Sequence, residues 1–350
     1  QRDDVELTLS AAEPDLSPSA RHRAAGRILG WCGGDPPAVL HAVGVIGRDG
    51  PDAPLPVPQP HAVEIARRLD GLDDETAALL RIASHLGTAV DSILLAAVTE
   101  TPIEDLVGRL SLAAARGLFE RASKPGWWAF PDRLTREAIG AGLDESTILQ
   151  THAVAGRWLL DTLGDLGAAA RHLVEGVPLI DATTAGDAAR RAGQLLMGEG
   201  SYEDAAFLFA KAAELAPTIR DGDADRVATA DALERTGDHD EANDIYDDVI
   251  TRCGPDEVDR LADVALGGAG RASRIGGQER RRHRLELAWP RLPADHPRAG
   301  DVTAELGLEL FIAGRPIPPP LWDDLRRVAD DADSPCLLYT SDAADDVSTV

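Results

Sequence analysis

The sequence predicts a mainly α-helical protein whose C-terminal half is an α-solenoid of paired helices. Hydrophobic residues make up 44% of the 350 residues but aromatic residues only 4%, which favours close packing of small residues between helices. Apolar residues recur at helical spacing along most of the chain. Similar segments begin at Gly200 and Gly237, a step of 37 residues, which is typical of helical repeats.

Composition excludes several classes of protein. The net charge is −25 and the only lysines are Lys124 and Lys211, so we expect this chain to bind no nucleic acid. Cys32, Cys253 and Cys336 lie far apart without C-x-x-C spacing, which indicates neither a disulfide framework nor a zinc site. No apolar run approaches the roughly 18 residues of a membrane span. The chain begins without Met or a signal segment, so we expect a cut N-terminus and a cytoplasmic location.

The first 46 residues predict a small helical element. The alternation in Val5–Leu9 favours one short strand, and an amphipathic helix follows it. After a glycine turn, Pro36 and Pro37 stand where a new helix begins, because the first N–H groups of a helix are unpaired in any case. Residues 47–62 alternate proline with small and polar residues, which predicts an extended linker.

Residues 63–145 predict three helices and a β-hairpin, the arrangement of a small winged-helix domain. Asp73 is a candidate cap for the first helix, and Thr101 with Glu104 has the pattern of a capping box. A Lys-Pro-Gly turn precedes Trp127 and Trp128, which predicts a hairpin with one tryptophan closing the core and the other partly exposed. Residues 146–198 predict connecting helices.

Residues 199–335 predict paired helices of the tetratricopeptide type. In the segments that begin at Gly200 and Gly237, Ala205 aligns with Ala242 and Phe209 aligns with Tyr246; fainter echoes begin at Gly277 and Gly314. The alanines allow two helices to approach, and the aromatic rings fill the space one turn further on. Stacked pairs form a curved groove, which is a surface for partners and not a catalytic pocket.

No segment predicts an enzyme. The phosphate-binding pattern G-x-x-x-x-G-K-[ST] is absent, so this chain alone should hydrolyse no nucleotide. The glycines of residues 267–277 lack the register of a dinucleotide-binding turn. The run from Asp221 resembles a calcium loop but has Arg226 where glycine is needed, so we expect a solvated helix start.

Histidines and acidic residues do not form a convincing metal or catalytic site. His239 stands among acidic residues that the repeat explains as a turn and an acidic helix start. His41, His152 and His172 lie in helical runs without a catalytic partner at suitable spacing, and we expect each to be packed or exposed. We therefore predict no catalytic residue and no metal ligand.

Three stretches in this order resemble one known class of protein. "WCGGDPPAVLHAV" resembles the turn and helix that close the ATPase lid of STAND-type signalling ATPases. "LLRIASHLG" through "WWAFPDRLTREAIGAGL" resembles their winged-helix domain, and "ARRAGQLLMGEGSYEDAAFLFAKAAEL" resembles their tetratricopeptide-like sensor. The sequence is most similar to the large ATP-dependent LuxR-family transcriptional regulators of bacteria, over roughly Val5 to Pro335. Residues 1–46 would then be the C-terminal part of the ATPase lid.

The resemblance implies a nucleotide contact. In that family the turn lies against the adenine nucleotide, so Gly34, Asp35 and Pro36 would be the cofactor-binding residues, with Pro36 making the contact. ATP or ADP would bind the parent protein, whose phosphate-binding loop would precede Gln1, and would not bind this chain tightly. Asp35 replaces the family's asparagine, and Asp132 stands where the family commonly has a histidine. The carboxylate of Asp132 would repel a nucleotide phosphate.

The resemblance also implies a signalling role. The chain would transmit a nucleotide-dependent switch and receive a small-molecule inducer or a protein partner on its helical repeats, while the parent would form homo-oligomers and bind DNA through a helix-turn-helix outside this chain. The alternative is a tetratricopeptide interaction scaffold of a different signalling protein, linked to a kinase or a cyclase. Cys336–Val350 contains "CLLYTSDAADD", which resembles a translated sequencing adapter, and we expect a non-native tail there.

Overall fold

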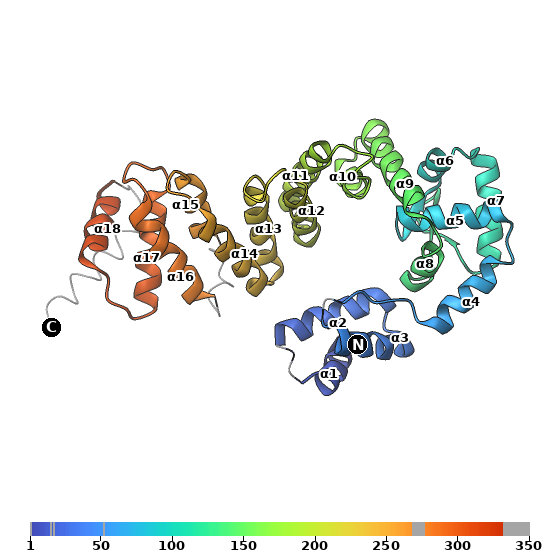
Figure 1. Cartoon of the computed structure of the whole chain (residues 1–350), viewed down its shortest axis with the longest axis horizontal. Helices are drawn as coiled ribbons and strands as arrows, with labels where there is room; N and C mark the ends of the chain where they lie inside the picture. The colour runs from blue at the N-terminus through green and yellow to red at the C-terminus, as the bar shows by residue number, and fades with distance from the viewer. Residues whose placement is uncertain (1, 15, 17, 52, 268–276, 332–350) are drawn as a thin grey trace. The chain divides into compact units, whose positions relative to one another are not determined.

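The protein is mainly α-helical, as the sequence predicts. The computed structural model describes residues 2–14, 16, 18–51, 53–267 and 277–331, which form helices α1 to α18 and three short strands (Figure 1). The chain divides into two compact units, Gln1–Ala182 and Thr183–Val350. The finer domain boundaries suggested by the sequence remain predictions, and the expected non-native tail lies outside the described residues.

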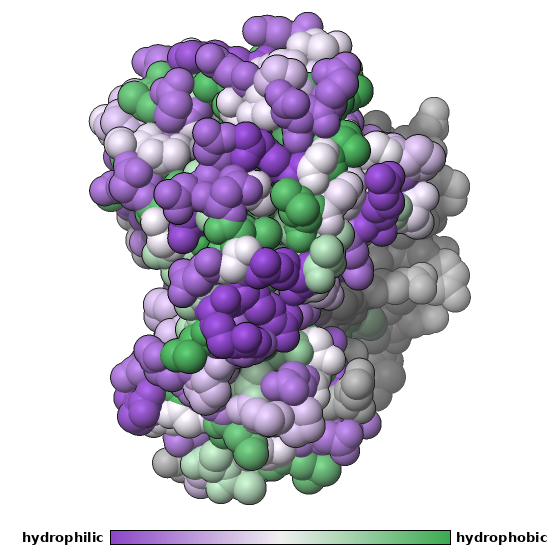
Figure 2. Space-filling view, turned by 90° about the vertical axis from the view of Figure 1, so that its right-hand side faces the viewer, coloured by the Kyte–Doolittle hydropathy of each residue, from purple (hydrophilic) through white to green (hydrophobic). Residues whose placement is uncertain are grey.

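One face of the molecule is largely polar. Figure 2 shows a face on which hydrophilic residues predominate and apolar residues form small groups between them. Within the described ranges, no helix combines the length and the apolar character needed to cross a bilayer.

Three helices form the beginning of the first unit: α1 (Arg2–Ala12), α2 (Pro18–Cys32) and α3 (Pro36–Asp49). The prediction of a strand at Val5–Leu9 is wrong, because this segment lies inside α1. Val5 and Leu9 are 4% and 0% exposed, whereas Leu7 is 69% exposed. Burial therefore follows the spacing of four residues that a helix face has, and not the alternation of a strand.

An extended segment joins α3 to α4 (Gln59–Leu69). It lies against the first three helices: Arg27 donates hydrogen bonds to the carbonyls of Pro51 and of Ala53, the latter at 2.8 Å. His41 Nε2 lies 3.1 Å from the Pro56 carbonyl oxygen. The proline-rich run is thus extended, as expected, and is held to α2 and α3 by side chains.

The next block combines helices with a small sheet. Its elements are α5 (Asp74–Leu86), β1 (Ala89–Asp91), α6 (Ser92–Thr99), α7 (Ile103–Ala115), β2 (Glu120–Arg121), β3 (Trp127–Ala129) and α8 (Arg133–Gly140). The sheet is antiparallel in the order β1-β3-β2, and Val90 of β1 faces Trp128 of β3. The predicted hairpin is confirmed as β2 and β3, whereas β1 was not predicted.

Local signals in this block are partly as predicted. The Asp73 carboxylate accepts a hydrogen bond from the Thr76 N–H at 2.8 Å and caps α5. The predicted capping box at Thr101 is wrong, because α7 begins only after Pro102 and has no side-chain cap. Trp128 is 3% exposed and closes the core, while Trp127 is partly exposed, as expected.

Two antiparallel helices complete the first unit: α9 (Glu145–Trp158), which continues into a short π-helix (Leu159–Leu163), and α10 (Leu166–Glu175). Glycines allow their close contact. A Cβ atom at Gly156 would lie 2.9 Å from the side chain of Leu173, so no larger residue fits there without a shift.

The second unit is a series of helices in which successive members pack on each other, from α11 (Ala182–Glu199) to α18 (Pro319–Asp331) (Figure 1). Between them lie α12 (Tyr202–Glu214), α13 (Asp223–Thr236), α14 (His239–Arg252), α15 (Val258–Leu266), α16 (Gln278–Ala288), a 3₁₀ turn (Trp289–Arg291) and α17 (Ala299–Ile312). The turn glycines Gly200, Gly237 and Gly314 have φ of 82°, 94° and 64°, where other residues are strained. The predicted helical-repeat solenoid is confirmed.

Small and aromatic residues pack in this unit as the repeat predicts. Ala205 and Ala242 are fully buried, and Phe209 and Tyr246 are 4% and 0% exposed. A Cβ atom at Gly193 in α11 would lie 2.9 Å from the Phe209 ring. The helices are therefore close enough that the aromatic ring occupies the space a larger residue would need.

Candidate functional site

The turn between α2 and α3 is the site for which the resemblance implies a nucleotide. Gly33 and Gly34 have φ of 63° and 89°, a conformation that suits glycine. The Asp35 carboxylate accepts a hydrogen bond from the Ala38 N–H at 3.1 Å and caps α3, and Pro36 occupies the first turn. Gly34, Asp35 and Pro36 thus lie together at an exposed helix start; their contact with a nucleotide stays a prediction.

An apolar surface adjoins this turn. Pro36 and Pro37 are exposed, and Leu40, one helical turn further along α3, is 65% exposed. The other face of α3 is buried: Ala38, Val39, Ala42 and Val43 belong to the core formed with α1 and α2. The capped end of α3 is therefore a rigid support for an exposed group of apolar side chains.

Trp31 links this turn to α8. Its side chain is buried, and its Nε1–H donates a hydrogen bond to Glu137 Oε2 at 2.7 Å. Arg133 Nε donates to the other oxygen of the same carboxylate at 2.7 Å, and Leu134 packs in the core of the first three helices. Any rearrangement of the turn that moves Trp31 must therefore break this link or move α8 with it.

Asp132 has a structural role in α8. Its two carboxylate oxygens accept hydrogen bonds from the N–H and the hydroxyl of Thr135, at 2.7 and 2.9 Å. The residue thus caps the helix at the position where the resembling family commonly has a histidine. A carboxylate carries a negative charge and only accepts hydrogen bonds, so it is unsuited to binding a phosphate.

Acidic residues at the start of α13 are buried and paired. The expectation of a solvated helix start is wrong for Asp223 and Asp225, which are 0% and 2% exposed. Arg190 donates two hydrogen bonds of 2.8 Å to Asp225, and Arg252 donates one of 2.6 Å to Asp223. Arginine can compensate the desolvation of a buried carboxylate through several charge-assisted hydrogen bonds.

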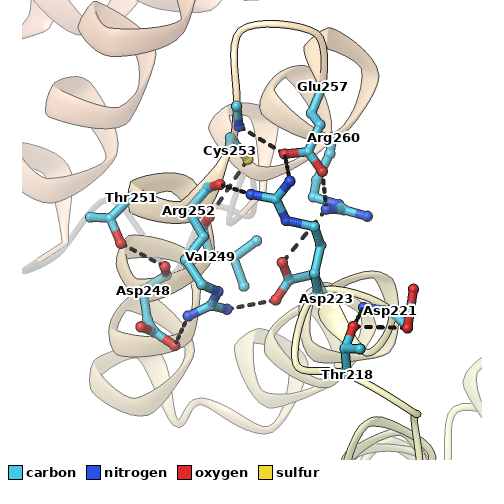
Figure 3. A network of polar contacts seen from close by, with 12 residues as sticks. Thr218, Asp221, Asp223, Asp248, Val249, Thr251, Arg252, Cys253, Glu257 and Arg260 are labelled. Atoms are coloured by element: carbon cyan, nitrogen blue, oxygen red, sulfur yellow. Dashed lines mark hydrogen bonds and ion pairs between the residues drawn. The ribbon is translucent and has the colours of Figure 1, made fainter.

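The Asp223 pair belongs to a network that joins α13, α14 and α15 (Figure 3). Arg252 also forms an ion pair of 2.6 Å with Asp248. The Glu257 carboxylate accepts hydrogen bonds from the Gly254 N–H at 2.7 Å and from Arg260 at 2.5 Å. The Gly254 N–H lowers the pKa of Glu257 below its ordinary value. The network ties α13, α14 and the start of α15 together.

A second polar chain passes through the interior of the repeats. The Tyr246 hydroxyl donates a hydrogen bond of 2.5 Å to Asp231, and the Arg284 guanidinium lies 4.9 Å from the Tyr246 ring centroid. Arg284, itself fully buried, donates to Asn243 at 2.9 Å and to Asp247 at 2.8 Å. Burial raises the pKa of Tyr246 and of Asp231 and lowers that of Arg284.

Helices α16 and α17 share a buried ion pair. Arg281 and Glu309 are 3% and 2% exposed, and Arg281 Nη1 lies 2.5 Å from Glu309 Oε1. Arg281 also donates a hydrogen bond of 2.9 Å to Glu305. The buried Arg281 thus lies between two carboxylates of α17.

Three histidines meet between α5, α9 and α10. His152 Nδ1 lies 2.9 Å from His172 Nδ1, and the His85 ring centroid lies 6.1 Å from that of His152. Burial lowers the pKa of His152 and of His172 to about 4, and it also lowers that of His85. His152 and His172 are packed, as expected, but they also pair with each other, and a separation of 20 residues gave no sign of it.

The described residues offer no metal site. Within the described ranges, no group of three or more His, Cys, Asp or Glu side chains is arranged to hold an ion. His239 instead pairs with Glu234 at 3.2 Å, and most of the rejected glycine-rich run of residues 267–277 lies outside the described residues.

Comparisons with known proteins give one remote likeness. No protein-family model and no curated protein matches the chain. A solved structure, described as a Signal Transduction ATPase with Numerous Domains (STAND) protein with a tetratricopeptide repeat sensor from Pyrococcus horikoshii, aligns with 96% of this chain at 11% identity and a TM-score of 0.32. This chain spans 55% of that protein.

Proposed function

We propose that this chain is the switch-transmission and sensing region of a STAND-type, ATP-dependent regulator of the LuxR family. The observation that carries the proposal is the hydrogen bond between Trp31, which adjoins the turn at Pro36, and Glu137 of α8. It connects the turn for which the resemblance implies a nucleotide to the block that follows it. The chain covers a lid, a switch block and a sensor in the order that the resemblance implies.

At the turn between α2 and α3, the exposed side chains of Pro36 and Leu40 would contact a planar base, while the Asp35 carboxylate faces α3 as its cap. A negative charge at this helix start opposes the binding of phosphate, so the phosphates would lie away from it, on the ATPase core of the parent. The turn would therefore contact the adenine part of ATP or ADP.

The block from α5 to α8 would transmit the switch. Its order of helices and strands and its β1-β3-β2 sheet support the proposal that it is the winged-helix domain which the resemblance implies. α7 begins with Glu104 and Asp105, so this domain would pack on protein and not on DNA. A change of nucleotide would move Trp31 and, through Glu137, the position of α8.

The second unit would be the sensor. Its helix pairs are joined by ion pairs in their interior, which makes the unit a stable support whose outer surface is available for a small-molecule inducer or a protein partner. In the cytoplasm of the source cell, binding there would release the parent to form homo-oligomers and activate transcription.

The test uses the intact parent protein and fluorescent ADP. Pro36→Ala should weaken binding about 3- to 10-fold, whereas Pro54→Ala, in the exposed linker, should leave it unchanged. Trp31→Phe keeps an aromatic ring and loses the N–H donor. It should preserve ADP affinity but abolish the nucleotide-dependent change in amide exchange of α8. Equal affinities of the Pro36 and Pro54 variants would reject the nucleotide role.

Sequencing the source gene on both sides separates this function from the alternative scaffold. A phosphate-binding loop upstream and a helix-turn-helix downstream of Pro335 would support the regulator. A kinase or cyclase downstream would support a tetratricopeptide scaffold of another signalling protein.

A further inference from the structure

We propose that the second unit binds a small, uncharged, ring-bearing molecule in a pocket between α17, α18 and the segment that contains Trp289. Only the biological role of this pocket, that of an inducer site, rests on the proposed sensor function. The evidence for the pocket itself is the arrangement of residues on the last helix pair. This pair, α17 and α18, appears in orange and red in Figure 1.

The pocket has a volume of about 350 Å³. Trp289, Leu292 and Val328 supply aromatic and aliphatic wall, and the small residues Ala299 and Gly300 keep one side open. Ligand pockets have volumes of roughly 300–1,000 Å³ and combine an apolar wall with a few convergent polar groups. A volume near the lower limit suits a ligand of one or two fused rings.

The charged groups of the pocket compensate each other. Asp324 accepts a hydrogen bond of 3.0 Å from the Trp289 indole N–H, and its other oxygen pairs with Arg327. A ligand carboxylate would face Asp324, and a ligand ammonium would compete with Arg327 for the same oxygen. This pair is partly exposed, and each of its side chains already has a partner of opposite charge, so the pocket offers a ligand no unpaired charge. We therefore assign the site to neutral molecules.

Thr303 supplies an unused polar group. The residue is 4% exposed and lines the pocket, and none of the hydrogen bonds found among the described residues involves its hydroxyl. The hydroxyl oxygen itself is not fully enclosed, so a water molecule can bond to it in the free chain and a ligand can replace that water. A hydroxyl or amide on the ligand would satisfy Thr303 and fix the orientation of the rings, which the apolar wall alone does not do.

The experiment titrates the 350-residue chain with three probes of matched shape: 1-naphthalenemethanol, 1-naphthoate and 1-naphthylmethylammonium. Six tryptophans give separate indole N–H signals in a ¹H–¹⁵N spectrum, and Trp289→Phe identifies the signal of interest. The alcohol should shift the Trp289 signal with a Kd on the order of 0.1–1 mM, and each charged probe should bind at least about 5-fold more weakly.

Two variants locate the binding. Ala299→Leu fills the pocket and should abolish the shift, and Thr303→Val removes the hydroxyl and should weaken binding about 3- to 10-fold. The exposed Thr251→Val serves as the matched control and should bind as the unchanged chain does. Amide spectra of all variants should match the parent chain outside the substituted region.

The proposal is overturned if the alcohol leaves the Trp289 signal in place, if Ala299→Leu binds normally, or if a charged probe binds as tightly as the alcohol. None of these results depends on nucleotide. Binding at Trp289 together with absent ADP binding by the parent would keep the pocket and reject the regulator, so the two failures are distinguishable.

Discussion

Acidification should destabilise the first unit through the paired imidazoles of His152 and His172. Their Nδ1 atoms are 2.9 Å apart, a distance that requires one nitrogen to donate and the other to accept. Protonating both rings turns both nitrogens into donors. The charged side chains that act on the three rings are Arg136, near His85, and Arg171, next to His172, and neither favours another positive charge.

The direction and size of the effect follow from the lowered pKa values. In the unfolded chain both groups take up protons near pH 6.5, whereas in the folded chain they do so only near pH 4. The contribution of the two neutral histidines to the free energy of unfolding is therefore fully present above about pH 6.5, and it is lost as the pH drops toward 4. A shift of this size corresponds to about 2 kcal/mol per group at pH 5. Because both rings keep some solvent contact and each affects the other, we expect roughly 2 kcal/mol for the pair.

Urea unfolding at pH 7.5 and pH 5, combined with ¹³C NMR titration of the imidazoles, measures this effect. Two histidines should remain neutral down to about pH 5, and the loss of stability between the two pH values should fall by about half in His172→Leu. His22→Gln, at an exposed histidine paired with Glu6, is the matched control and should not change the loss. Ordinary titration of His152 near pH 6.5, or an unchanged loss in His172→Leu, would refute the reasoning.

Other predictions concern stability, measured by urea unfolding at pH 7.5. Gly193→Ala should lower the free energy of unfolding by about 1–3 kcal/mol, because its Cβ would lie 2.9 Å from an aromatic ring of the next helix. Gly198→Ala in the same helix meets open space and should raise the free energy of unfolding by up to about 1 kcal/mol. Equal effects of the two substitutions would contradict the packing. Asp35→Ala should cost about 1 kcal/mol and Asp35→Asn almost nothing, and a large loss in the asparagine variant would show that the cap needs charge. Glu309→Gln should lower the free energy of unfolding by about 1–3 kcal/mol, because it leaves the buried Arg281 with the partly exposed Glu305 as its remaining carboxylate partner; a neutral result would mean that Glu305 compensates the charge of Arg281 by itself.

The sequence predicts elements well where a local signal is decisive. Asp73 and the prolines at 36 and 37 mark helix starts because capping and the free N–H groups of a first turn are properties of a few adjacent residues. The strand at Val5–Leu9 was a wrong prediction because five residues fit a period of two as well as a spacing of four. β1 was missed since its three residues become a strand only through pairing with β3.

Contacts between distant residues had no comparable signal. The link from Trp31 to Glu137 spans 106 residues, and nothing in either local sequence indicates the other. The same holds for Trp289 and Asp324 of the proposed pocket, 35 residues apart. The repeat predicts that such residues stand on neighbouring helices, but it does not predict which side chains meet.

The interior charges have a physical cause in the composition of the repeats. Helices that meet through alanine and glycine leave an apolar interface with little shape to fix their register, because small residues slide past one another at low cost. Arg281 and Arg284 add both volume and direction, since a guanidinium binds its carboxylates only in a fixed geometry. We infer that these pairs set the register of successive helices at some cost in stability. Replacing Arg281 and Glu309 together by Met and Leu should then raise the free energy of unfolding while broadening the amide spectrum of α16 and α17, and a spectrum as sharp as that of the parent chain would show that apolar packing already fixes the register.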